Sequence, residues 1–210
     1  MEKFTGLDIE RAQRDLERFG NGYIAVAGRM QSTFSIFFDA LATKWASVNA
    51  ITFKSRYAPK AEKIVSDFCS HASGILKDAE AAAKSLSRAH GMGFSGVNIS
   101  RLSTTSYGDN IKETINGVTG MAVQNVKFIL EQFESNVKNI ATSLSELPRG
   151  IAFYSPDGSL ISAYNAKVGS LISEFEGLCN EMSRGVKSYM ETEIDNILLA
   201  KEQAQSMMNG

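Results

Sequence analysis

Apolar residues recur every three or four positions along four long stretches of the chain, with polar residues between them. This spacing gathers the apolar side chains on one face of an α-helix, as helices that pack in a bundle require. The pattern therefore predicts four helices, over residues 8–43, 47–90, 110–147 and 155–206. Arms of about 35–45 residues would be about 50–65 Å long, at about 1.5 Å per residue.

The apolar pattern repeats once when the sequence is shifted by 107 residues. Seven apolar positions then coincide with apolar positions. The pairs are Val26 and Phe133, Met30 and Val137, Phe37 and Leu144, Tyr57 and Tyr164, Ile64 and Leu171, Phe68 and Phe175, and Ile75 and Met182. The repeat predicts two helical hairpins in series, like a dimer fused into one polypeptide. Because long helices bury an apolar stripe only against other helices, we expect an all-α, elongated four-helix bundle built from two antiparallel hairpins. The hairpins would comprise residues 1–90 and 110–210, joined by a linker rich in glycine and serine at residues 91–109.

Local signals indicate where the helices begin and bend. Asp8 is a candidate N-cap for the first helix. Asn110 and Glu113 have the spacing of a capping box at the start of the third. Residues 155–157, Ser-Pro-Asp, predict the start of the fourth helix. Pro59 removes a backbone donor, so we expect a kink there or a short helix before the main part of the second helix.

Composition and charge exclude several classes of function. The chain has 22 basic and 23 acidic residues, so nothing indicates a nucleic acid or an anionic membrane surface as partner. It contains no uninterrupted apolar run that could span a membrane, and its N-terminus lacks the apolar stretch of a secretory signal peptide. Cys69 and Cys179 are too few for a disulfide framework and are expected to be free, partly buried thiols.

The sequence offers little for catalysis or for holding a metal. The two histidines, His71 and His90, do not lie in the HExxH or ExxH spacings of metal sites, so no metal is expected. Residues 91–96 match G-x-G-x-x-G, but a predicted helix precedes them where a dinucleotide site requires a strand. We therefore expect a protein that is not an enzyme and binds no cofactor.

One dense apolar segment spreads around more than half of the first predicted helix. It contains Phe34, Phe37, Phe38 and Leu41. These residues are expected to form either the junction between the two hairpins or a patch for another protein.

Residues 41–57 resemble the turn between the helices of the WXG family. Members of that family are small helical hairpins exported by the bacterial type VII (Esx) secretion system, with a tryptophan at the bend and a glycine two residues later. Trp45 matches the tryptophan, whereas Ser47 stands where the glycine is expected. At the second bend Phe153 and Tyr154 supply aromatic residues but no tryptophan. The resemblance covers nearly the whole chain, as a pattern of two hairpins.

A second feature of the family is the export signal Y-x-x-x-D/E on the tail of a helical pair. Tyr189 and Glu193 fit this signal, and their spacing puts both side chains on one helix face. The first hairpin has Ala82 and Leu86 at the corresponding positions. The resemblance implies that the secretion ATPase reads Tyr189 and Glu193 together.

The resemblance implies a protein that leaves the bacterial cytoplasm without a cleavable signal peptide and acts by contacting other proteins. Its expected partners are the type VII machinery and either another secreted protein or a second copy of itself. One alternative is a cytoplasmic helical adaptor or chaperone, for example the companion of an LXG-type toxin, that is not itself exported. Another is a membrane-active helical protein, suggested by the phenylalanines near Phe37, although membrane contact is not the favoured expectation.

Overall fold

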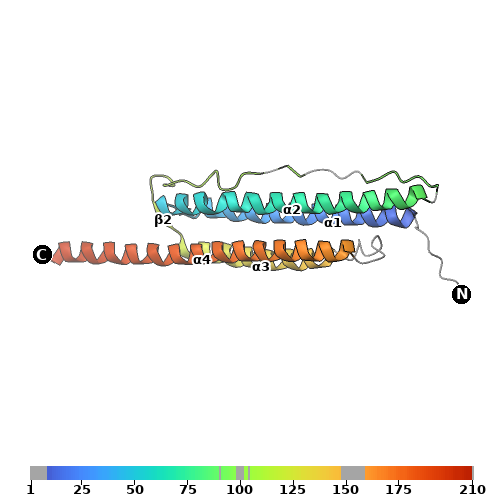
Figure 1. Ribbon diagram of the computed structural model, residues 1–210. Helices are drawn as coiled ribbons and strands as arrows, with labels where there is room; N and C mark the ends of the chain where they lie inside the picture. The colour runs from blue at the N-terminus through green and yellow to red at the C-terminus, as the bar shows by residue number, and fades with distance from the viewer. Residues whose placement is uncertain (1–8, 90, 98–101, 104, 148–158, 210) are drawn as a thin grey trace. The chain divides into compact units, whose positions relative to one another are not determined.

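The computed structural model describes residues 9–89, 91–97, 102–103, 105–147 and 159–209. Over these residues the protein is an all-α bundle, which confirms the predicted fold class (Figure 1). Its four helices are α1 (Ile9–Ala42), α2 (Val48–Ala89), α3 (Val123–Glu146) and α4 (Ser159–Asn209). The predicted caps at Asp8 and at residues 155–157 lie outside the described residues.

A short pair of strands ties the segment before α3 to the bend between α1 and α2. Strand β1 (Trp45–Ala46) pairs antiparallel with β2 (Gly120–Met121), so that Trp45 lies opposite Met121. The backbone N–H of Ala122 also donates to the carbonyl oxygen of Lys44, at 2.7 Å. These bonds fix the point from which α3 departs.

The prediction that the third helix begins at Asn110 was wrong, because α3 begins at Val123. Ile115 and Val118 form an isolated β-bridge around a tight turn. The two residues between them, Asn116 and Gly117, both have positive φ, at 52° and 76°. Asn-Gly is the pair that most favours this kind of turn, and it stops a helix from propagating through the segment.

Helix α2 is continuous across Pro59, so the expected separate short helix is absent. Pro59 costs α2 one backbone hydrogen bond. The buried apolar residues on both sides of it, Phe53, Tyr57, Ile64 and Phe68, show that packing stabilises the helix through this point.

The chain divides into two compact units, each containing part of every helix. Unit 1 consists of Met1–Gln31, Lys63–Thr104 and Asn139–Phe175, and unit 2 of Ser32–Glu62, Thr105–Lys138 and Glu176–Gly210. The division into two hairpins stays a prediction.

Unit 1 has an apolar core drawn mainly from α1 and α2, including Leu16, Phe19 and Ile75, with Val168 contributed by α4. Beside this core the Tyr23 hydroxyl donates to the carbonyl oxygen of Cys69, at 2.8 Å. Burial raises the pKa of Tyr23 well above its usual range, so this hydroxyl stays protonated and remains a donor.

The residues related by the 107-residue shift are core residues. All seven members of the first set are buried, and so are six of the second; the side chain of Tyr164 lies outside the described residues. The apolar stripes read from the sequence are therefore the faces that the helices bury. The two cysteines are free, Cys179 buried and Cys69 half-buried, as predicted. None of the described helices is both long enough and apolar enough to cross a membrane.

Candidate recognition site at the bend between α1 and α2

Trp45 lies at the centre of the bend and is fully buried. Its indole Nε1–H donates to Ser47 Oγ, at 2.9 Å. The same oxygen accepts the backbone N–H of Ala50, at 3.2 Å, and so caps the first turn of α2. Ser47, which stands where the WXG pattern has glycine, therefore satisfies both a buried indole and a helix terminus.

Tyr189 of α4 packs against the bend of unit 2. Its ring centroid is 5.4 Å from that of Trp45 and 6.5 Å from that of Phe53, in an edge-on arrangement with the latter. Trp45 and Phe53 are themselves 5.6 Å apart. The three rings form one aromatic cluster, with Tyr189 half-buried on its outer side.

Glu193 lies one helical turn beyond Tyr189 and is also held at the bend. Only 9% of its surface is exposed. The Asn49 side-chain amide donates a hydrogen bond to Glu193 Oε1, at 3.4 Å. The two residues are 144 positions apart in the sequence. The structure thus brings together three residues singled out by the resemblance, Trp45, Tyr189 and Glu193.

Sequence reasoning missed the role of Asn49. Its only local signal is its position two residues after the cap of α2. That position indicates a residue near the start of the helix and gives no partner for its side chain. Nothing in the spacing indicates that it meets Glu193, because that contact depends on how α4 packs beside α2.

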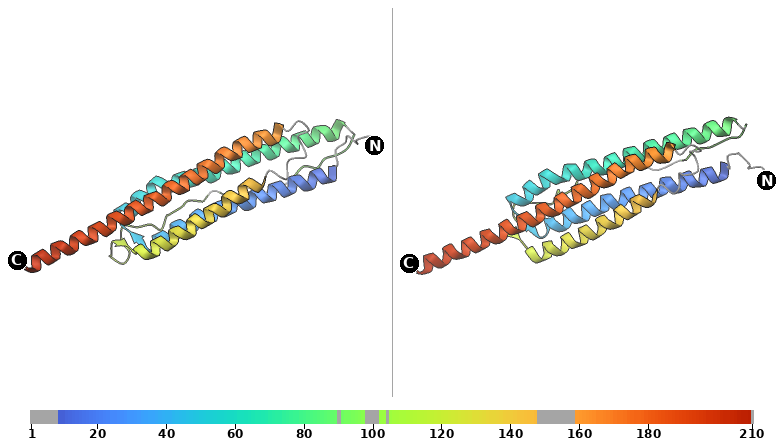
Figure 2. Two further views of the ribbon diagram at one scale, coloured as in Figure 1. Left: turned by 90° about the horizontal axis from the view of Figure 1, so that it is seen from below. Right: turned by 60° about the horizontal axis from the view of Figure 1, so that its bottom comes forward.

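Beyond Glu193, α4 continues as a single helix past the start of α2, as both views in Figure 2 show. Every residue from Ile194 to Met208 is exposed. The exposed surface includes several large apolar side chains, namely Ile194, Ile197, Leu198, Leu199, Met207 and Met208. This tail offers an apolar surface that its own unit leaves uncovered.

The phenylalanine-rich segment is core and not a partner surface, so that part of the prediction was wrong. Phe34, Phe37, Phe38 and Leu41 are all buried in unit 2. Phe37 stacks on Phe133 of α3, with centroids 4.1 Å apart. The segment spreads around the helix because it meets several elements of the same chain at once.

Tyr107 is a core residue that the sequence reading left in the linker. It is buried, with its ring stacked 6.1 Å from that of Phe38 and tilted 5.6 Å from that of Phe34. An isolated aromatic residue in a polar segment was the only signal that could have indicated this anchor.

Ion pairs join α2 and α4 next to the aromatic cluster. Glu181 binds Lys60 and Arg56, with nitrogen-to-oxygen distances of 3.1 and 3.0 Å. The hydrogen bond from Lys60, together with the positive charges of Lys60 and Arg56, lowers the pKa of Glu181. Tyr57 lies beside this group. Its burial raises its pKa, and the negative charge of Glu181 raises the pKa further.

The second predicted bend, at Phe153 and Tyr154, lies outside the described residues. Among the residues that are described, no group of three or more histidine, cysteine, aspartate or glutamate side chains is arranged to hold a metal ion.

Comparisons of the chain with known protein families, with curated proteins and with solved structures found no match.

Proposed function

We propose that this chain is a non-enzymatic helical protein exported by a type VII secretion system, acting afterwards through contacts with other proteins. The observation that carries the proposal is the contact of Tyr189 and Glu193 with the bend that contains Trp45. The export-signal match and the bend-motif match were found separately in the sequence, yet in the folded protein Tyr189 and Glu193 lie against the bend, where Trp45 is buried and Tyr189 is half-exposed at the surface.

The geometry of this surface supports recognition by a protein. Tyr189 is anchored by ring contacts and Glu193 by Asn49, so both are held in position before a partner arrives. Preorganised groups lose less conformational entropy on binding than mobile ones.

The adjoining tail supplies the apolar contact area that a protein partner needs. Its two acidic residues, Asp195 and Glu202, outnumber its single basic residue, Lys201. The tail therefore suits a partner that offers an apolar groove with a basic rim.

The first test is an immunoblot of culture supernatant from the native host, with and without its type VII secretion ATPase. Protein found outside the cell only in the presence of the ATPase is the expected result. Protein confined to the cytoplasm in both strains would contradict export and would favour the helical adaptor or chaperone.

The second test changes the signal residues. We expect Glu193→Gln and Tyr189→Ala to abolish export, because each removes one of the two groups that the partner reads. Glu191→Gln is the matched control, since Glu191 is an exposed acid on the same turn of α4. Export of Glu193→Gln at the wild-type level would count against the proposed signal.

Tyr189→Ala also removes a packed ring, so its cellular level and melting temperature must be measured alongside export. Tyr189→Phe keeps the ring contacts with Trp45 and Phe53 and removes only the hydroxyl. Loss of export in a folded Tyr189→Phe variant would identify the hydroxyl as the group recognised, whereas retained export would assign the recognition to the ring.

A further inference from the structure

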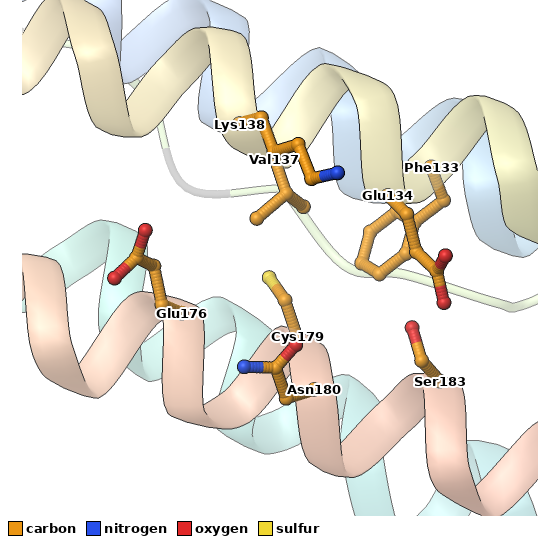
Figure 3. Close-up of a pocket in the computed structure, with 8 residues that line it drawn as sticks. All are labelled: Phe133, Glu134, Val137, Lys138, Glu176, Cys179, Asn180 and Ser183. Carbon is orange, nitrogen blue, oxygen red and sulfur yellow. The ribbon is translucent and has the colours of Figure 1, made fainter.

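A cleft of about 360 Å³ lies between α3 and α4 within unit 2 (Figure 3). Its apolar wall comes from Phe133 and Val137 of α3 and from Cys179 of α4, all of them buried. A cavity of about 150 Å³ is enough to bind benzene. This cleft therefore has room for a fused aromatic ring with a short side chain.

Ser183 places an unsatisfied polar group in the cleft. The residue is 5% exposed, and its hydroxyl has no hydrogen-bond partner among the residues that the structure describes. In Figure 3 this hydroxyl points from α4 toward α3. Buried hydroxyls without a partner are rare because desolvation is unfavourable, so a ligand that bonds to Ser183 would remove that penalty.

One carboxylate at the cleft has an oxygen atom left with which to bind a cation. Glu134 and Glu176 line the cleft with Lys138, and their two charges are balanced by those of Lys138 and Lys187. Glu134 lies at the same end as Ser183 (Figure 3). Its Oε1 already accepts from Lys187, at 3.0 Å, and a carboxylate has a second oxygen with which to bind another cation.

We propose that this cleft binds a small arylalkyl amine, with the aromatic ring against Phe133 and Val137 and the ammonium group donating to Ser183 Oγ and to the Glu134 carboxylate. An ammonium group has three donors and can make both bonds at once. The site uses none of the residues of the proposed export surface, so the two proposals stand or fall separately.

Three probes that share an indole ring test the chemistry on the full chain. Tryptamine carries an ammonium group, tryptophol a hydroxyl group and indole-3-acetate a carboxylate. We expect tryptamine to bind about tenfold more tightly than tryptophol, as a charge-assisted hydrogen bond implies, and indole-3-acetate to bind most weakly. Nuclear magnetic resonance should show shifts at residues 133–138 and 176–183. Equal binding of the three, or no binding of tryptamine at millimolar concentration, would overturn the proposal.

Variants then separate a ligand contact from a structural role. Ser183→Ala and Glu134→Gln should each weaken tryptamine binding about tenfold. The exposed neighbours provide the controls Ser188→Ala and Glu131→Gln, which should leave the affinity unchanged. Without ligand, Ser183→Ala should melt at or above the wild-type temperature, because it removes a buried group that lacks a partner. A lower melting temperature with unchanged tryptamine affinity would show that the hydroxyl serves folding and not binding.

Discussion

At the scale of single residues, the bend depends on one hydroxyl group that accepts two hydrogen bonds. Ser47 Oγ receives the indole N–H of Trp45 and the backbone N–H of Ala50. A glycine at this position would leave both donors without that partner. The departure from the WXG pattern is thus accompanied by a gain of two hydrogen bonds.

We expect Ser47→Ala to lower the free energy of unfolding by about 1–2 kcal/mol, because it removes a helix cap and leaves a buried donor unpaired. Ser47→Thr keeps the hydroxyl and should retain most of the stability. Urea denaturation would measure both changes. The control is Ser32→Ala, at an exposed position of α1, and a loss for Ser47→Ala no larger than for this control would contradict the prediction.

Trp45 supplies the largest side chain buried at the bend. Its replacement by alanine should cost about 3–5 kcal/mol of unfolding free energy, because the ring leaves a cavity among Phe53 and Tyr189. Phe128→Ala, on the exposed face of α3, should change the stability by less than about 0.5 kcal/mol. Comparable losses in the two variants would show that the bend is not a packed core.

At the scale of the elements, α2 and α4 are held together by close packing as well as by charge. A Cβ atom added to Gly185 would lie 3.1 Å from the Tyr57 hydroxyl oxygen, so the two helices approach closely there. Glu181 bridges the same helices through Lys60 and Arg56. Each of these features depends on residues from both helices.

The ion pairs of Glu181 predict a specific dependence of stability on pH. Its pKa is lowered in the folded protein, so its contribution is present above the unfolded pKa of about 4.3 and is lost as the pH falls through the folded value. The group is partly exposed, which limits the effect to about 1 kcal/mol or less.

Glu181→Gln should therefore lower the stability at pH 7 and leave it nearly unchanged at pH 3. High salt should reduce the difference in unfolding free energy between the wild type and Glu181→Gln at pH 7, because salt screens exposed charges. Denaturation curves at the two pH values would measure this. An equal loss at both pH values would show that the side chain acts through packing and not through its charge.

At the scale of the whole molecule, the C-terminal part of α4 extends beyond the last buried residues of the helix. Met190 and Glu193 are the last buried residues of α4 among those whose burial the structure describes, and the residues from Ile194 to Met208 are all exposed. The tail adds an accessible apolar surface to unit 2 but makes little contribution to its core.

Removal of residues 195–210 should therefore change the unfolding free energy by less than about 0.5 kcal/mol. Removal of residues 181–210 is the matched comparison and should be strongly destabilising, since it deletes the buried Met182, Val186 and Met190. Amide hydrogen exchange on the full chain should show low protection in the tail and high protection around Val186. A large loss of stability in the shorter truncation would contradict the assignment of the tail as a surface element.

Much of the fold could be predicted from local pattern. The spacing of apolar residues identified four helices, the faces they bury and the bend at Trp45, because a helix period of 3.6 residues is a local property. The start of α3 was missed, although Asn116 and Gly117 carry a strong turn signal, because the apolar residues around them also fit a helical period.

The sequence by itself determined which residues are apolar on each helix and which carry the Trp45 bend and the Tyr189–Glu193 match. Only the tertiary structure decided that these two features meet, that Asn49 holds Glu193, that Phe34, Phe37, Phe38 and Leu41 are enclosed and that Ser183 faces a cleft. The physical reason is that periodicity sets the buried face of a helix but not the partner that covers it. That choice is made by packing between residues far apart in the chain.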